Sequence, residues 1–163
     1  MKRRSSQSGM LLIEAMVAVL IFALGILGLV AMGGAAVNAQ SDAQYRTEAA
    51  NLADAIAGEI QLATTRNNAG EVVPTSLGNF SHFEGGGDCL FSGSPATDAR
   101  VQALADSSPL PGAIVSGTQR TQQILVSTAA ASSPAPNRVQ ITVCWKSNND
   151  TVRRQHVLVT YVN

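Results

Sequence analysis

The side chains best suited to chemistry gather in one short stretch of the sequence. His82, Glu84, Asp88 and Cys89 lie close together in the chain, and these residue types are common metal ligands. Their spacing matches no zinc pattern, and the Glu-Gly-Gly-Gly-Asp run lacks the ligand order of a calcium loop. We therefore expect a surface loop here and no bound metal.

The remaining reactive residues do not suggest catalysis. Neither His82 nor His156 has a serine or cysteine partner at a recognisable spacing. The glycine run Gly85–Gly87 is not followed by the lysine and serine, or the helix start, that a phosphate-binding loop needs. We expect neither a catalytic residue nor a cofactor.

The charge of the chain gives no reason to expect a nucleic-acid partner. The 11 basic residues balance the 11 acidic ones, so bulk charge does not attract a polyanion. Arg138, Arg153 and Arg154 are the only cluster that suggests contact with DNA, and a solvated turn explains them better.

A single carboxylate interrupts the most apolar part of the chain. Residues 10–37 carry one charged side chain, Glu14, and a helix of about 20 apolar residues crosses a bilayer. A charge in such a span costs roughly 2.5–3.5 kcal/mol near its centre and less near an end, so it is a functional candidate. Lys2, Arg3 and Arg4 precede the run, which predicts a cytoplasmic N-terminus and an exported C-terminal part.

Two ordinary interpretations of this segment each leave something unexplained. A secretory signal peptide cut after Ala39 would leave Gln40 as the mature N-terminus, but its apolar region usually has about 7–15 residues and no carboxylate. A plain membrane anchor explains the length of residues 10–37 and gives Glu14 no role.

The run SGMLLIEAMVAVLIFALGILGL resembles the class III signal of the type IV pilin-like family. In that family a short basic leader ends in glycine, and a prepilin peptidase cuts after it and methylates the new N-terminus. A glutamate then follows at the fifth mature position. The resemblance implies cleavage after Gly9, a methylated Met10, and Glu14 at the glutamate position.

This resemblance also gives the glutamate a physical role. An unpaired carboxylate in an apolar helix bundle is costly, so Glu14 of one subunit would pair with the Met10 amine of its neighbour. Such a pair would set the axial register of each incoming subunit. We therefore expect Glu14 to be a subunit-docking residue.

The two cysteines lie in the part of the chain that this topology exports. Cys89 and Cys144 are an even count, which favours a disulfide in an oxidising compartment. On the chain-entropy model the bond would stabilise the fold by about 4 kcal/mol. Two unpaired buried thiols are the alternative.

One long helix is predicted to carry Glu14 into a folded domain. Apolar residues recur at spacings of three and four along residues 38–65, which predicts an amphipathic helix. The stripe consists of Ala49, Leu52, Ala53, Ile56, Ile60 and Ala63. No proline separates it from residues 10–37, so we expect one helix from about Leu11 to Ala63. Its first half would lie in a membrane and its second half would pack on a sheet.

The rest of the chain reads as a connector followed by a sheet. Residues 66–120 are rich in turn-forming residues, which predicts an irregular connector with a short helix capped by Asp98. Residues 121–163 contain three alternating runs, TQQILVSTA, NRVQITVCW and RRQHVLVTYVN, which predict an antiparallel meander. The expected fold class is α+β.

A long N-terminal helix packed on such a sheet is the architecture of the pilin-like family. Within it, LGILGL (Leu24–Leu29) and the ending VQITVCWKSNND…HVLVTYV are similar to the type IV pilus modification group, the PilV minor pilins. The resemblance implies a structural, non-catalytic subunit that helps to prime or cap a pilus used in motility and adhesion.

The resemblance also implies partners and a location. The partners are the prepilin peptidase and methylase, other minor pilins, the major pilin and, as a further candidate, a tip adhesin. The location is the bacterial inner membrane, as a single-pass protein with a periplasmic C-terminal domain, and then the pilus tip or fibre. Two other functions stay open, a minor pseudopilin of a type II secretion system and a secreted periplasmic binding module.

Overall fold

The computed structural model describes residues 8–128, 137–148 and 150–163. Lys2, Arg3 and Arg4, on which the predicted orientation rests, lie outside these ranges. The chain divides into two compact units, Met1–Asp42 and Ala43–Asn163, and each is described by itself.

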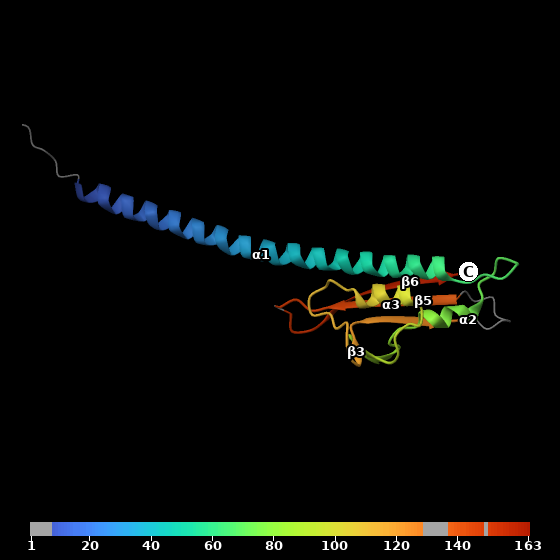
Figure 1. Ribbon diagram of the computed structural model, residues 1–163. Helices are drawn as coiled ribbons and strands as arrows, with labels where there is room; N and C mark the ends of the chain where they lie inside the picture. The colour runs from blue at the N-terminus through green and yellow to red at the C-terminus, as the bar shows by residue number, and fades with distance from the viewer. Residues whose placement is uncertain (1–7, 129–136, 149) are drawn as a thin grey trace, which may run out of the picture. The chain divides into compact units, whose positions relative to one another are not determined.

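The first element is the helix α1, Ser8–Ala63 (Figure 1). Its 56 residues match the predicted helix and begin three residues earlier. Alanine, leucine and methionine favour the helix, and the run has no proline to interrupt it. The four glycines of the apolar part (Gly25, Gly28, Gly33 and Gly34) have no heavy atom within 4 Å of an added Cβ, so no close packing requires them.

In the second unit, α1 contributes one face to the main core. The predicted apolar stripe is buried from Ala49 to Ile60, and Ala63 at its end is half-buried. The side chains of this stripe belong to the same cluster as those on one face of the C-terminal sheet. The amphipathic pattern therefore identified the packing face of α1 correctly.

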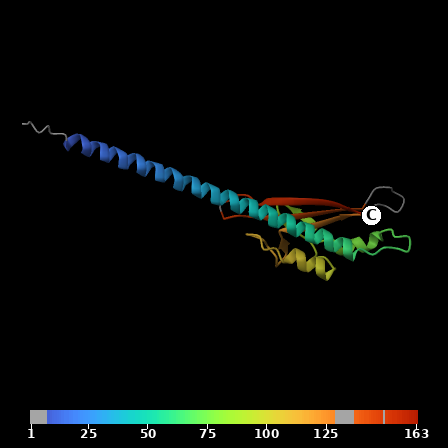
Figure 2. The ribbon, with the colours of Figure 1, turned by 90° about the horizontal axis from the view of Figure 1, so that it is seen from above.

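The C-terminal sheet is the predicted antiparallel meander, and the fold class is α+β. It consists of β4 (Gln122–Ser127), β5 (Asn137–Trp145) and β6 (Arg154–Val162), in that spatial order (Figure 2). The register places Ile124 opposite Ile141, and Ile141 opposite Leu158. The inner face of β5 fills the core with Val139, Ile141, Val143 and Trp145.

The segment expected to be irregular contains several short elements. They are α2 (Pro74–Leu77), the 3-10 helix η1 (Gly78–Phe80), β1 (Gly85–Gly87), β2 (Leu90–Ser92), α3 (Ala99–Asp106) and β3 (Gln119–Arg120). As predicted, Asp98 caps its helix, accepting hydrogen bonds from the backbone N–H groups of Arg100 and Val101, both at 3.0 Å.

The second sheet, β1-β2-β3, was not predicted from the sequence. Its first strand consists of three glycines, which are typical of turns and not of strands. Gly86 has φ +87°, and a Cβ there would lie 2.4 Å from the Leu90 carbonyl oxygen, so the tight hairpin requires glycine. Phe83, Cys89, Phe91 and Cys144 form a separate buried cluster. Cys144 is therefore buried even though it lies on the face of β5 opposite the main core.

Candidate assembly site and its anchored domain

The residues singled out for processing and docking lie at the start of α1. Gly9, Met10 and Glu14 all lie within this helix. Met10 and Glu14 are four residues apart, so they share one helix face, and the rise of 1.5 Å per residue separates them by about 6 Å along the axis. Among the described residues, Glu14 has no hydrogen-bond or ion-pair partner.

The apolar half of α1 packs against none of the other residues that the structure describes. Every side chain from Met10 to Gln40 is exposed, including Met10 at 80% and Phe22 at 70%. Burying a side chain of this size gains roughly 1.5–3 kcal/mol. Apolar surface that is this extensive marks a membrane or protein interface.

Length and composition allow α1 to cross a membrane. Its most apolar 18-residue stretch has a mean hydropathy of 2.8, and α1 is the one such helix among the residues described. A signal sequence shares both properties. The helix is therefore compatible with single-pass anchoring, and Glu14 is its one charged residue before Asp42.

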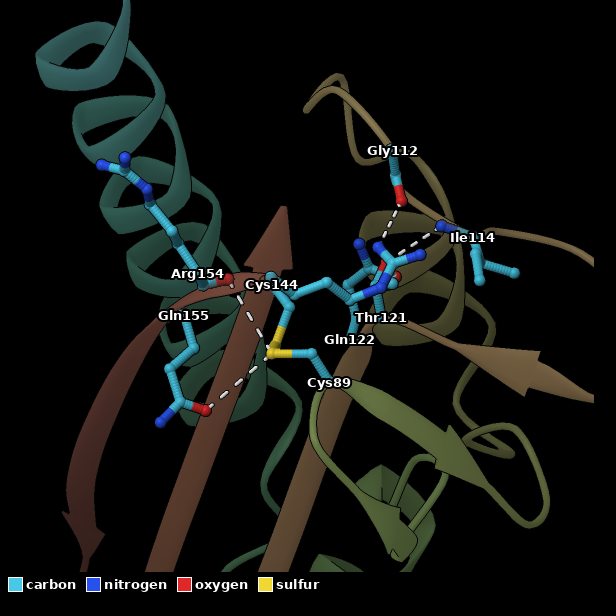
Figure 3. The surroundings of a disulfide bond; sticks show 9 residues. Cys89, Gly112, Ile114, Thr121, Gln122, Cys144, Arg154 and Gln155 are labelled. Atoms are coloured by element: carbon cyan, nitrogen blue, oxygen red, sulfur yellow. Dashed lines mark hydrogen bonds between the residues drawn. A yellow bond between two sulfur atoms is a disulfide. The ribbon is translucent and has the colours of Figure 1, made fainter. Parts of the chain in front are cut away.

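The predicted disulfide between Cys89 and Cys144 is present (Figure 3). Its Cα atoms are 5.7 Å apart, and 55 positions separate the two residues in the chain. The Sγ atom of Cys89 lies 3.8 Å from the Arg154 carbonyl oxygen and 3.9 Å from Oε1 of Gln155. A disulfide sulfur has no proton to donate, so we treat these as packing contacts. The bond fastens the β1–β2 hairpin to the outer face of β5.

A charged pair that was not predicted from the sequence supports the same region. The Arg120 guanidinium donates to Oδ1 of Asp106 at 2.7 Å and to the carbonyl oxygen of Gly117 at 2.8 Å. It also lies 4.7 Å from the centre of the Phe83 ring. The Arg120 and Asp106 side chains are only 10% and 23% exposed. Removing one partner of such a pair leaves a costly buried charge.

His82 joins the connector to the C-terminal sheet. Its backbone N–H donates to the Ile124 carbonyl oxygen at 3.0 Å, and its carbonyl oxygen accepts from the Ile124 N–H at 2.9 Å. Nδ1 accepts a hydrogen bond from the backbone N–H of Ala96 at 3.2 Å. Because Nδ1 accepts this bond it carries no proton, and the ring is neutral. The side chain is fully buried.

The environment of His82 favours this neutral form. Burial lowers the pKa of His82 from 6.5 to about 4; the Asp106 carboxylate opposes this shift and the Arg120 guanidinium adds to it. Nε2 has no hydrogen-bond partner among the described residues. The side chain therefore acts as a packed, uncharged acceptor in this structure.

The structure does not gather the other residues that were considered for chemistry. Among the described residues, no three His, Cys, Asp or Glu side chains lie together in a way that could hold a metal ion. Cys89 is bonded to Cys144, and Nδ1 of His82 accepts from the Ala96 N–H.

The three arginines do not form one patch. Arg138 lies opposite Tyr161, and Arg154 lies opposite Trp145, at the other end of the β5–β6 ladder. Seven residues along β5 separate the two positions, about 23 Å at 3.3 Å per residue. Arg153 donates to the Gly112 carbonyl oxygen at 2.6 Å, and Arg154 pairs with Asp150 at 2.9 Å.

Comparison with known proteins adds no further identification. No known protein family, no curated protein and no solved structure matches the chain significantly.

Proposed function

We propose that this protein is a minor pilin, a structural subunit that helps to prime or cap a type IV pilus. One observation carries the proposal. The side chains from Met10 to Gln40 are all exposed on one helix, and the one charge among them, Glu14, follows Met10 by a single helical turn.

The physical basis of assembly is the burial of this helix among similar helices. In the membrane, lipid covers the apolar side chains; in a fibre, neighbouring helices replace the lipid. Packing then provides the association energy, since lipid is as apolar as the helix surface. Glu14 adds specificity, because an unpaired carboxylate in such a bundle is costly.

The pairing group is created by processing. Cleavage after Gly9 frees the amine of Met10, and the Glu14 carboxylate of an adjacent subunit would pair with it. A subunit displaced along the axis would leave both charges unpaired, so the pair would select one register. This arrangement makes the prepilin peptidase and methylase the first partner, and other minor pilins and the major pilin the later ones.

The proposed location follows from the same segment. The protein would first lie in the bacterial inner membrane with its N-terminus in the cytoplasm and residues 43–163 in the periplasm. It would then move to the fibre or its tip. The disulfide supports an oxidising compartment for the second unit, because disulfides persist there.

The deciding experiment is mass spectrometry of the mature N-terminus, on protein isolated from the cells that make it. We expect a methylated Met10. An N-terminus at Gln40 would show instead that a conventional signal peptidase removes the apolar segment. An unprocessed Met1 would contradict cleavage at Gly9.

The docking role of Glu14 has a separate test. Glu14→Ala should leave membrane insertion and cleavage intact and lower the amount of the protein in sheared fibres on the order of 10-fold, equivalent to about 1.4 kcal/mol. Glu48→Ala, on the part of α1 within the second unit, is the matched control. Normal recruitment of the Glu14 variant would contradict this role.

A further inference from the structure

The strand β6 forms an open edge of the C-terminal sheet. Hydrogen bonds elsewhere establish which way its backbone groups point. The N–H of Cys144 donates to the Thr121 carbonyl oxygen at 2.9 Å, so Cys144 faces β4. Because backbone groups alternate sides along a strand, Val143 and Ile141 face β6 instead.

This alternation continues across the β5–β6 register. His156 lies opposite Val143 and Leu158 opposite Ile141, so these residues and the other even-numbered positions of β6 bond to β5. The N–H and C=O groups of the odd-numbered positions point away from the sheet. They belong to Gln155, Val157, Val159 and Tyr161, and no further strand pairs with them among the described residues.

The same residues also expose their side chains. Val157 is 42% exposed, Val159 39% and Tyr161 56%, and none of the four positions is charged or a proline. Edge strands are usually protected by charge, proline or a bulge. The edge of β6 has none of these protections and offers unpaired backbone groups beside apolar side chains.

The opposite edge of the sheet is occupied at its middle. Ile124, on β4, uses its outward N–H and C=O groups to bond to His82. A second copy of this chain that added its β4 edge to β6 in head-to-tail fashion would have to displace this bridge.

Direction excludes the other way of adding a second copy. Two β6 strands related by a two-fold axis would run antiparallel, and their attached helices would be reversed too. In the second unit, α1 and β6 run in the same direction (Figures 1 and 2). Both end beside an open groove, which is lined by residues that include Gly58, Leu62, Tyr161 and Asn163. Copies of this chain that are anchored in one membrane by their N-terminal helices share one direction, so two of them cannot pair through β6 in this way.

We propose that the open edge of β6 accepts an extended strand from a different helix-anchored subunit. The proposal rests on the pilin-like function argued above. The incoming strand hydrogen-bonds to the outward groups of Val157, Val159 and their neighbours, and carries uncharged residues where it faces them. The uncharged edge matches an uncharged strand, because a charged side chain there would lose hydration without gaining an ion pair. Its end leaves β6 at the groove beside Leu62, which is 83% exposed.

The first test measures hydrogen exchange of the Val157, Val159 and Tyr161 amides in the full processed chain. In the isolated chain in detergent these amides should exchange rapidly, whereas the Leu158 amide, bonded to β5, should be protected. In assembled complexes sheared from the producing cells, exchange at the three outward amides should slow on the order of 100-fold. Equal exchange in the isolated and the assembled wild-type chain would overturn the proposal.

The second test blocks the edge without breaking the sheet. Val159→Pro removes an N–H that β5 does not use, and proline is tolerated at such edge positions. We expect incorporation into the complex to fall on the order of 10-fold, equivalent to about 1.4 kcal/mol. Val159→Lys, which keeps the N–H and adds a charge, is the second variant if the proline variant unfolds.

The matched control is Val152→Lys, the same change at a 73% exposed valine that precedes β6. It should be incorporated like wild type. Normal incorporation of both Val159 variants, with thermal stability unchanged, would overturn the edge proposal while leaving the pilin role intact. An N-terminus at Gln40 in the wild-type protein would contradict the pilin role. That measurement does not depend on the Val159 variants, so the two failures can be told apart.

Discussion

At the scale of single residues, the two candidate polar groups behave in opposite ways. Glu14 is a charged group whose side chain is exposed on the first turns of α1. His82 is a buried group that already has a backbone hydrogen-bond donor at Nδ1. The first is suited to bind something outside the chain, and the second is suited to hold the chain's own connector in place.

The burial of His82 predicts a pH-dependent stability. Its pKa is about 4 in the fold against 6.5 ordinarily, so the unfolded chain binds the proton first as the pH falls. Stability should therefore be lost between pH 6.5 and 4, by about 2–3 kcal/mol at pH 4.5 relative to pH 7. Denaturant unfolding of the full chain in detergent at the two pH values measures this loss.

His82→Gln tests the cause of that loss. Glutamine retains an acceptor for the Ala96 N–H and does not titrate, so the variant should lose about 2–3 kcal/mol less than wild type between pH 7 and pH 4.5. His156→Gln, at a half-buried position on β6, is the matched control for the loss of a histidine. An unchanged pH dependence in the His82 variant would contradict the assignment.

At the scale of elements, the disulfide and the His82 bridge attach the connector to two neighbouring strands of the C-terminal sheet. Cys144 is on β5, whereas Ile124 is on β4. The β1–β2 hairpin has no core of its own beyond Phe83, Phe91 and the two cysteines. Its stability should therefore depend on the disulfide more than the stability of the meander does.

Replacing both cysteines, Cys89→Ser with Cys144→Ser, should lower the free energy of unfolding by about 4 kcal/mol on the chain-entropy model. Hydrogen exchange should accelerate most across β1 and β2 and least across β5. Chemical denaturation and residue-resolved exchange measure the two effects. A uniform acceleration through β4, β5 and β6 would show that the bond supports the whole domain.

At the scale of the whole molecule, the two units differ in whether the chain itself buries their apolar side chains. The described side chains of the first unit up to Gln40 are exposed and mostly apolar, whereas the second unit buries its own core. The second unit should therefore fold without the first, and the first should account for insolubility in water.

A chain limited to residues 43–163 should consequently be soluble and folded. The α1 stripe from Ala49 to Ile60 remains in this fragment, so the main core stays complete. Size-exclusion chromatography should show a monomer at micromolar concentration, and circular dichroism should show both helix and strand. Aggregation of the fragment under non-reducing conditions would mean that the second unit needs the first.

The sequence alone determined the features that depend on local periodicity. A spacing of three and four located the buried face of α1, alternation located β5, and a cap residue located α3. These signals are readable because each is repeated or flanked within a few residues. The α+β class followed from these signals, and the disulfide was predicted from the even number of cysteines and the expected export of this part of the chain.

Only the tertiary structure decided the parts that depend on distant contacts. The burial of Cys144 depends on a hairpin over 50 residues earlier in the chain, and the neutral state of His82 depends on Ala96 and on its burial. Which backbone groups of β6 stay open depends on the bonding direction of Cys144 on the neighbouring strand. The residues of a strand do not reveal which of its backbone groups a neighbouring strand will use. Alternation defines two faces and two edges, but the neighbours that cover them come from distant parts of the chain.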